Sequence, residues 1–320
     1  MAQRSWNTGE PLELVELPTP NVGTRDVRVR VESIGLNPAD CQMLIAPPLR
    51  LLARLLGPKP PVVLGVDFAG EIEAVGSAVT DFRPGELVVG GTNFSRGQRG
   101  CFAETVVVRD DQICRIPDSV DLDTAVGLAI PGVTAHRTVV EHGHIRRVAP
   151  AARRILVLGA SGAVGQLIVQ IGKLEGAFVV GVCSTRNVGL VKELGTDVVL
   201  DYTQGDVLEQ ARAYGPFQVV AECADAYARR QCVSLLASTG RFVMVSMHNP
   251  LDIVHTVIPP FQTRTLLGNP TRRRLEPLMA MAGAGQLTVN VAQRLPLASL
   301  EEAVKLSDSG RMTGKLILQP

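Results

Sequence analysis

The sequence has few aromatic residues and almost no net charge. Aromatic residues make up 4% of its 320 positions, and 32 basic residues against 31 acidic ones leave a formal net charge of +1. A chain with this balance has no overall field that would draw it to nucleic acid or to an anionic membrane. Because aromatics are scarce, its core must consist mainly of Val, Leu, Ile and Ala. The length suggests two domains and allows a large core.

Long apolar runs and paired cysteines are also absent from the sequence. No apolar run approaches the roughly 18 residues that a bilayer-spanning helix needs, and residues 1–7 lack the apolar core of a signal peptide. The six cysteines contain no C-x-x-C pair. Scattered single thiols of this kind are typical of buried residues in a cytosolic protein. We therefore expect a cytoplasmic protein that is not stably inserted into a membrane and does not bind nucleic acid.

Residues 1–120 carry the patterns of short β-strands. Residues 27–32 alternate apolar and charged side chains, which is the period of a half-buried strand. Further short strands, separated by Gly, Pro and Asp turns, are expected at 71–75, 86–90 and 103–108. The Leu-rich, basic segment 48–56 predicts a short helix instead. This helix either packs on the core through its leucines, or lines an apolar substrate mouth or touches a membrane surface.

From residue 121 the pattern changes to an alternation of helices and strands. Residues 123–141 predict helices, and apolar runs then predict strands at 155–158, 178–183, 198–202, 217–221 and 240–246. Helices are expected between the later strands at 188–194, 206–214 and 229–237. Strict alternation implies a parallel sheet with helices on both faces. The remaining segments predict helices at 273–283 and 300–309, an alternating segment around 289–291 and a strand at 314–318.

A glycine turn stands near the centre of the chain. The apolar strand 155–158 is followed by Gly159, Gly162 and Gly165, and apolar residues then recur at helical spacing. Strand, glycine turn and helix together direct free backbone N–H groups and a helix N-terminus at a diphosphate. Gly162 lets the backbone approach the pyrophosphate, and Gly165 lets the helix lie close to the strand. The alternative is a tight turn that binds no ligand.

The end of the second strand of this region indicates which dinucleotide binds. An NAD-dependent enzyme usually has Asp or Glu there to bind the ribose 2′-OH, whereas this chain has Cys183, Ser184, Thr185 and Arg186, with Lys192 further on. Hydroxyl groups and a guanidinium suit a 2′-phosphate, because arginine can bond phosphate through two N–H groups. We therefore predict NADPH as the cofactor. The alternative is that Arg186 and Lys192 are solvated charges at a helix start, where a cation opposes the helix dipole.

Further motifs are spread over the full length of the chain. They lie at residues 35–40 (Gly-Leu-Asn-Pro-Ala-Asp), 64–72, 75–79, 82–86, 132–135, 183–187, 201–202 and 314–317. Together with the glycine turn they resemble the zinc-independent branch of the medium-chain dehydrogenase/reductase superfamily, which includes quinone oxidoreductases and enoyl reductases. The resemblance implies an α/β fold with a GroES-like β-barrel catalytic domain over 1–120, completed by 270–320. A Rossmann domain with a doubly wound parallel sheet would occupy 121–269, and the protein would be a homodimer.

The resemblance also assigns site residues by their positions in these motifs. It implies Asn37, Asp40 and Thr134 as catalytic residues, with Asn37 facing the substrate and ribose. Cofactor contacts are implied for Thr134 and Ser246 near the nicotinamide, and for Ala224 and Lys315. The remaining implied contacts are Ser161, Gly162, Ala163 and Val164 at the pyrophosphate, and Ser184, Thr185, Arg186 and Tyr202 on the 2′-phosphate side.

No zinc site is expected. Residues 37–40 and 65–67, where zinc-dependent relatives have their ligands, contain neither Cys nor His. A structural zinc site would need four clustered thiolates, and residues 90–115 offer only Cys101 and Cys114. The five histidines follow no ligand spacing tied to a cysteine. Without a Lewis acid to lower the pKa of an alcohol, alcohol oxidation is unfavourable.

These observations predict hydride transfer from NADPH to an activated C=C bond, in an enone or enoyl thioester, or to a quinone. The developing enolate oxygen needs a hydrogen-bond donor, for which Asn37, Thr134 or a backbone N–H are candidates. The proton donor stays open, because Gln42 stands where relatives carry a tyrosine. Water and Asp40 are candidates, and Asp40 is alternatively a turn or cap residue. Two other functions stay open: a specialised biosynthetic step on a polyketide- or alkaloid-like intermediate, and NADPH binding without turnover.

Overall fold

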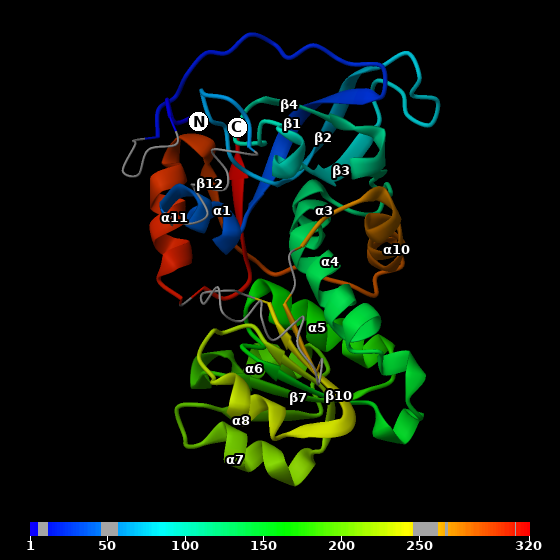
Figure 1. Cartoon of the computed structure of the whole chain (residues 1–320), viewed down its shortest axis with the longest axis vertical. Helices are drawn as coiled ribbons and strands as arrows, with labels where there is room; N and C mark the ends of the chain where they lie inside the picture. The colour runs from blue at the N-terminus through cyan, green and yellow to red at the C-terminus, as the bar shows by residue number, and fades with distance from the viewer. Residues whose placement is uncertain (6–11, 46–56, 246–261, 266–267, 311) are drawn as a thin grey trace. The chain divides into compact units, whose positions relative to one another are not determined.

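The computed structural model describes residues 1–5, 12–45, 57–245, 262–265, 268–310 and 312–320. The chain divides into two compact units, the first containing Met1–Ile130 and Asn269–Pro320, and the second Pro131–Gly268 (Figure 1). The sequence placed the start of the second part at residue 121. The division falls later because helix α3 (Leu122–Leu128) packs on strands β1 and β2 of the first unit, with its Ala125, Val126 and Leu128 fully buried.

The first unit is built around a mostly antiparallel sheet, to which the described residues contribute seven strands. Its order is β12-β13-β1-β2-β3-β5, and β4 pairs with β1 outside this path. The bounds are β1 (Asp26–Leu36), β2 (Asp67–Val75), β3 (Leu87–Gly91), β4 (Thr105–Arg109), β5 (Ile113–Arg115), β12 (Val291–Pro296) and β13 (Lys315–Gln319). Strand β1 pairs with β2, β4 and β13, and register shifts in its pairing with β2 bend it between these neighbours. The last strand thus lies beside the first.

The alternation expected at 27–32 is present in β1. Val27, Val29 and Val31 point into the core, while Arg28 and Arg30 reach the surface, where they pair with glutamates of β2. The described helices that accompany the sheet are α1 (Pro38–Ile45), α3, α10 (Arg272–Gly283) and α11 (Leu300–Asp308). This unit therefore draws its core from both ends of the chain.

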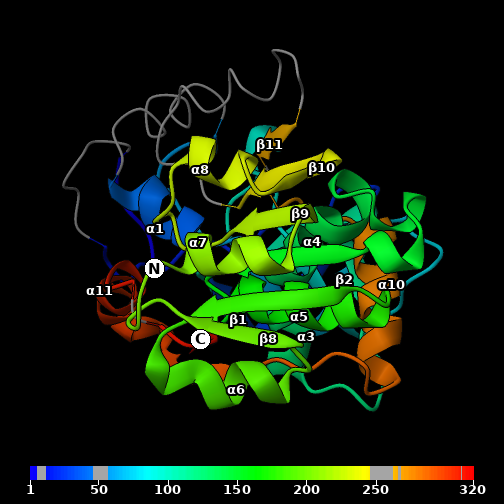
Figure 2. The same ribbon diagram turned by 90° about the horizontal axis from the view of Figure 1, so that it is seen from below.

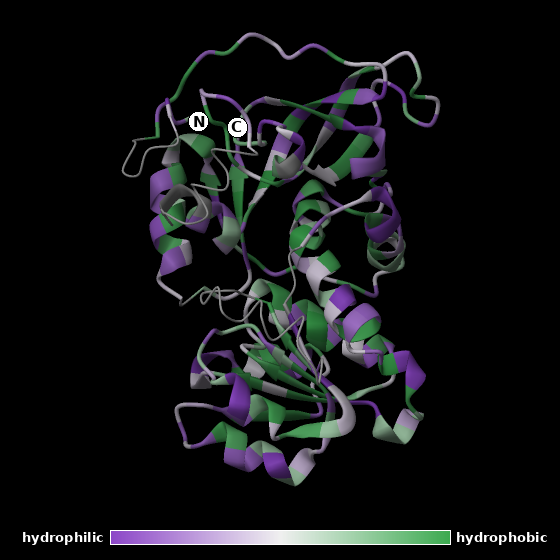
Figure 3. Cartoon of the chain, viewed as in Figure 1, coloured by the Kyte–Doolittle hydropathy of each residue, from purple (hydrophilic) through white to green (hydrophobic). Residues whose placement is uncertain are grey.

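The second unit is a parallel sheet with the order β11-β10-β9-β6-β7-β8. Its strands are β6 (Arg154–Leu158), β7 (Phe178–Cys183), β8 (Val198–Asp201), β9 (Phe217–Glu222), β10 (Leu236–Met244) and β11 (Thr263–Thr265). Counted along the chain, the order is 3-2-1-4-5-6, which is the doubly wound arrangement of dinucleotide-binding domains. The nearly continuous apolar runs of β6, β7 and β9 are buried, as a sheet covered on both faces requires. Figure 3 shows the strands of this unit mostly in green, the colour of apolar residues.

Helix α4 (Ile130–His136) and a π-helical turn (Arg137–His142) precede the first strand of this sheet. The helices between later strands are α5 (Ala163–Leu174), α6 (Val188–Glu193), α7 (Val207–Ala211) and α8 (Arg229–Val233). Helix α5 packs on β6 and β7, α6 packs on β7 and β8, and α8 packs on β10. Figure 2 shows α6, α7 and α8 around the strands of this unit.

The structure differs from the expected elements at a few places. The helix expected at 229–237 ends at Val233, because the backbone N–H of Phe217 donates to the carbonyl of Leu235 (2.9 Å) and draws the following residues into β10. Helix α1 and the short strands β5 and β11 were not expected. The predicted helix at 48–56 lies outside the described residues.

The described part of the chain has no helix that is long and apolar enough to cross a membrane. All six cysteines are free thiols; Cys223 is half-buried and the other five are buried. Their burial agrees with the interpretation of scattered cysteines as small apolar core residues.

Candidate functional site

The glycine turn lies at the point where the strand order of the parallel sheet reverses. Strand β6 has β7 on one side and β9 on the other, so its carboxyl end is flanked by connections that run in opposite directions. Leu158, the last residue of β6, is in register with Val182 and Glu222 of these neighbours. A crevice outside the carboxyl ends at such a point is where doubly wound sheets bind ligands.

Each of the three positions of the turn is glycine for a different physical reason. Gly159 has a φ of +84°, a left-handed conformation that other residues rarely adopt. A Cβ on Gly165 would lie 2.2 Å from the carbonyl oxygen of Gly159, so only glycine lets α5 approach β6 this closely. A Cβ on Gly162 would meet only that same oxygen at 3.6 Å among the described residues. The space beside Gly162 is therefore open to a ligand.

The start of α5 fits a diphosphate. Gly162 is the N-cap residue of this twelve-residue helix and offers no side chain to cap it. The first backbone N–H groups of a helix have no partner within the helix and carry a partial positive charge. Ser161, Ala163 and Val164 are all partly exposed here. The structure therefore brings the four predicted pyrophosphate residues together at one helix start, where they could hold the diphosphate of a nicotinamide dinucleotide.

The predicted 2′-phosphate residues lie at the carboxyl ends of β7 and β8. Ser184 is half-buried, Thr185 and Arg186 are exposed, and Tyr202 is 55% exposed. The Thr185 hydroxyl donates to the carboxylate of Asp201 (2.6 Å), which also accepts the backbone N–H and the hydroxyl of Thr203 (2.9 and 2.8 Å). The hydrogen bond from Thr185 is the main cause that lowers the pKa of Asp201. An ionised carboxylate therefore already engages Thr185.

Asn187 connects the two predicted phosphate regions and was not among the predicted site residues. Its buried side-chain amide donates to the hydroxyl oxygens of Ser161 (3.0 Å) and Ser184 (3.4 Å). The signal was present in the sequence, because Asn187 closes the motif at 183–187. Its contact with the glycine turn depends on the fold and could not be derived from spacing.

A buried glutamate shapes the other side of the crevice. The carboxylate of Glu222, at the end of β9, accepts the backbone N–H groups of Ala224 (3.1 Å), Asp225 (2.8 Å) and Ala226 (3.3 Å). Burial nevertheless raises the pKa of Glu222. The folded loop brings Ala224 beside Gly159, where a Cβ on the glycine would lie 3.1 Å from the Ala224 methyl group. Ala224 thus lies beside the glycine turn, held there by Glu222, a residue that the sequence prediction missed.

In the first unit, the structure joins Asn37, Asp40 and Lys315 in a buried polar cluster whose fourth member is Asp67. All four side chains are at most 3% exposed. The Asn37 amide nitrogen lies within hydrogen-bond distance of Asp67 Oδ2 (3.0 Å), Asp40 Oδ2 (3.2 Å) and the carbonyl of Gly35 (3.1 Å). Its carbonyl oxygen accepts from Lys315 Nζ (2.6 Å), which also lies 3.4 Å from Asp67 Oδ2. We therefore find Asn37 engaged on every side within its own unit.

The charges of this buried polar cluster do not balance when all its groups are ionised. Two carboxylates face one ammonium group, leaving one negative charge in the core. Burial, and then the Asp67 charge, raises the pKa of Asp40 to about 7, while burial raises the pKa of Asp67 and lowers that of Lys315. Asp40 Oδ2 accepts the backbone N–H of Asn37 (3.0 Å), whereas its Oδ1 has no hydrogen-bond partner among the described residues. That oxygen can carry the proton that neutralises the cluster.

Two further predicted residues are Thr134 and Ser246. Thr134 is buried on α4, in the part of that helix that belongs to the second unit. Ser246 lies outside the described residues. Within the described chain, no three His, Cys, Asp or Glu side chains gather closely enough to hold a metal ion.

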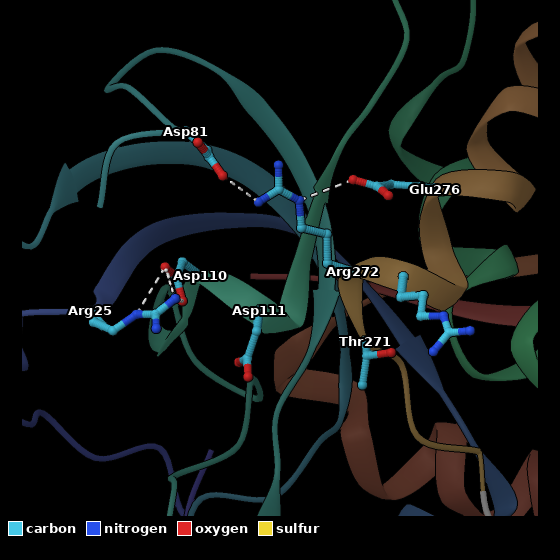
Figure 4. A pocket seen from close by; sticks show the side chains of 8 residues that line it. Arg25, Asp81, Asp110, Asp111, Thr271, Arg272 and Glu276 are labelled. Atoms are coloured by element: carbon cyan, nitrogen blue, oxygen red, sulfur yellow. Dashed lines mark hydrogen bonds and ion pairs between the residues drawn. The ribbon is translucent and has the colours of Figure 1, made fainter. Parts of the chain in front are cut away.

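A surface hollow of the first unit is lined by charged side chains (Figure 4). These charges are largely paired with one another: Arg25 with Asp110 (2.8 Å), and Arg272 with Asp81 (2.7 Å) and Glu276 (3.0 Å). Arg272 also lies over the Phe82 ring (5.0 Å). A hollow whose charges satisfy each other offers a ligand little binding energy, so we do not assign the function to it.

Comparisons with known proteins identify the family. A family model described as "Alcohol dehydrogenase GroES-like domain" matches residues 23–118, and one described as "Zinc-binding dehydrogenase" matches residues 194–318. Quinone-oxidoreductase QR1, chloroplastic, of Triphysaria versicolor is 30% identical over 316 residues, which cover 97% of this chain and 94% of that protein. The chain belongs to the medium-chain dehydrogenase/reductase superfamily, among its quinone oxidoreductase-like and enoyl reductase-like members.

Other relatives agree with this placement. The trans-enoyl reductase pgmF of Aspergillus terreus is 34% identical over 207 residues, 63% of this chain and 56% of that protein. The solved structure of the quinone oxidoreductase from Coxiella burnetii has the same fold, with a TM-score of 0.85 over 100% of this chain and 98% of that one at 23% identity. The predicted GroES-like and Rossmann folds are thereby confirmed. The protein is an oxidoreductase of this family, whose members use a nicotinamide cofactor.

Proposed function

We propose that this protein is an NADPH-dependent reductase that transfers hydride to an activated C=C bond or to a quinone without zinc. The observation that carries the proposal is the glycine turn at the reversal of strand order, open beside Gly162. When bound, the nicotinamide supplies the hydride, and the protein supplies position and electrostatics. Quinone oxidoreductases and a trans-enoyl reductase among the relatives support these two substrate classes.

The choice of NADPH rests on the residues that follow β7. Ser184, Thr185 and Arg186 stand where an NAD-dependent enzyme usually has an acidic residue. The acidic residue nearest in register is Asp201, opposite Cys183, and its carboxylate accepts hydrogen bonds from Thr185 and Thr203. Arginine is well suited to a 2′-phosphate, so we assign Arg186 to that group.

The buried polar cluster supports a reaction without zinc. The ammonium group of Lys315 contacts Asn37 Oδ1 and lies near Asp67, so the cluster already contains its own cation. Replacing that cation by a metal would require the lysine to leave a fully buried position. Metal analysis of the purified protein tests this, because one zinc ion per chain would contradict it.

The cluster also changes which residue we assign to the developing enolate oxygen. Asn37 has only two amide protons, and three acceptors already surround them. We therefore assign Asn37 to organising the cluster, and Thr134 or a backbone N–H to the donor role. We assign Asp40 to holding a proton, since its Oδ1 atom is the one oxygen of the cluster without a hydrogen-bond partner in the described chain.

A substrate screen tests the function. Purified protein is mixed with NADPH or NADH and with a quinone, an enal or an enoyl thioester, and oxidation of the dinucleotide is followed by absorbance. We expect turnover with NADPH on at least one substrate, and Arg186→Ala should lose most of the preference for NADPH over NADH. Ser234→Ala is the matched control, because Ser234 precedes β10 at the amino ends of the strands. Tight NADPH binding without turnover on any substrate would contradict the proposal.

We further propose a cytoplasmic homodimer. The six free cysteines suit a reducing compartment. The edge strand β11 pairs on one side with β10 and could pair with a second copy on the other. Light scattering of the purified protein tests the dimer, since a monomeric mass at micromolar concentration would contradict it.

A further inference from the structure

In the described chain, the side chain of Asn187 does not cap the helix that Asn187 begins. Asn187 is the N-cap residue of α6, where asparagine ordinarily accepts a hydrogen bond from the backbone of its own helix. The buried amide reaches instead to Ser161 in the glycine turn and to Ser184 after β7.

The direction of these two hydrogen bonds decides what the serines can do. An amide NH₂ group has two protons and donates only. Both protons point at hydroxyl oxygens, so both serines act as acceptors toward Asn187. A hydroxyl that accepts in this way keeps its own proton to give elsewhere. Ser161 and Ser184 are partly exposed, so these protons can reach a ligand with acceptor oxygens, such as a phosphate.

The Thr185 hydroxyl, unlike those of Ser161 and Ser184, acts as a donor within the protein. This hydroxyl donates to Asp201 (2.6 Å), and Thr203 donates to the other oxygen of the same carboxylate (2.8 Å). An ionised carboxylate can only accept. The proton of Thr185 is therefore used inside the protein, although sequence position placed this residue among the phosphate contacts.

We propose that Asn187 is a positioning residue of the nucleotide site, which holds Ser161 and Ser184 as hydrogen-bond donors toward phosphate groups. Asp201 at the same time withdraws Thr185 from this role. The 2′-phosphate is then recognised by Ser184 and Arg186, and the pyrophosphate side by Ser161. This inference rests on the proposed function, since it requires a phosphorylated nucleotide at this edge of the sheet.

The test is a calorimetric titration of the full chain with NADPH, NADH and adenosine 2′,5′-bisphosphate, which carries the 2′-phosphate but no pyrophosphate. A hydrogen bond to a charged group contributes about 1.5–3 kcal/mol, so Ser184→Ala should weaken bisphosphate binding about 10- to 100-fold. Asn187→Ala should cause a similar loss, and combining the two should add little, because both remove one unit. Thr185→Val should weaken binding by less than Ser184→Ala.

Two further variants sharpen the test. Asn187→Asp keeps the size of the side chain but accepts protons from both serines, so it should weaken NADPH more than NADH, and both more than Asn187→Ala does. Ser234→Ala is the control, and thermal unfolding establishes that each variant is folded. The inference is overturned if Asn187→Ala and Asn187→Asp bind all three ligands like the unmodified protein, or if Thr185→Val loses as much as Ser184→Ala. If the unmodified protein binds no nucleotide, the proposed function fails first and this inference fails with it.

Discussion

Replacing Asp40 by asparagine should change how the stability of the protein depends on pH. Asp40 is buried with one oxygen bonded to Asn37 and the other without a partner in the described chain. Burial and the neighbouring Asp67 raise its pKa to about 7. Asparagine has nearly the same shape but never ionises, so the difference between the two proteins isolates the titration of this carboxyl group.

The sign and size of the effect follow from linkage. A carboxyl group with a raised pKa binds its proton more tightly in the folded state, so its contribution is fully present below the unfolded pKa and is lost as pH rises through about 7. Between about pH 5 and about pH 7 the carboxyl group is protonated in the folded state and ionised in the unfolded state. The free energy of unfolding therefore falls by about 1.36 kcal/mol for each of these two pH units, or by up to about 3 kcal/mol by about pH 9. The asparagine variant lacks this loss. It instead leaves two buried N–H groups without an acceptor where the protonated carboxyl group leaves one O–H, which costs about 1–3 kcal/mol at every pH.

The assay is urea unfolding of both proteins at several pH values from about 5 to about 9. The unmodified protein should be the more stable at low pH, and its advantage should shrink by up to about 3 kcal/mol as pH rises. Asp118→Asn, a substitution at an exposed aspartate of the same unit, is the control and should show no such trend. A difference between the unmodified protein and Asp40→Asn that stays constant over this range would refute the assignment of the proton to Asp40.

Three other substitutions test the packing that holds the site. Gly165→Ala should lower the unfolding temperature and weaken NADPH binding, because its Cβ would lie 2.2 Å from a backbone oxygen; Gly189→Ala, which meets nothing within 4 Å, should do neither. Lys315→Met should reduce the free energy of unfolding by about 3–5 kcal/mol by leaving buried carboxylates uncompensated, and adding Asp67→Asn should restore part of it, as urea unfolding can measure. Glu222→Gln replaces one carboxylate oxygen by an NH₂ group, which cannot accept the three backbone N–H groups that surround Glu222. It should weaken NADPH binding in calorimetry and leave the structure of β6 unchanged. Unchanged affinity would show that the loop after β9 does not depend on this carboxylate.

The parallel sheet could be predicted from the sequence because its information is local. Each strand is a short apolar run, and Gly159 and Gly165 are required by backbone geometry that a strand–turn–helix pattern already implies. The end of the helix predicted at 229–237 could not be predicted in the same way. Its last residues are drawn into β10 by a hydrogen bond to Phe217, which only the assembled sheet provides.

Candidate site residues could be named one by one from the sequence, but their hydrogen bonding could not be predicted. Ser184 and Thr185 are adjacent and similar in sequence, yet one accepts from Asn187 and the other donates to Asp201. Asn187, at the start of α6, faces the Ser184 hydroxyl, whereas Asp201, at the end of the neighbouring strand β8, faces that of Thr185. In the same way, Asn37 and Asp40 were assigned to catalysis singly, whereas their surroundings are set by Asp67 and by Lys315, which is 278 positions away from Asn37.

The buried polar cluster also gives a physical reason why the last strand pairs with the first in one register. Strand β13 places Leu316 opposite Leu36, which sends the Lys315 side chain over Gly35, where a Cβ would lie 2.8 Å from the lysine Cε. A slip of one residue would turn every side chain of β13 to the other face of the sheet. Asp67 would then remain buried without a cation, which costs several kcal/mol. The Lys315–Asp67 ion pair need not add to the overall stability in order to fix the register. Losing the pair in the shifted register costs far more free energy than forming it in the native register contributes.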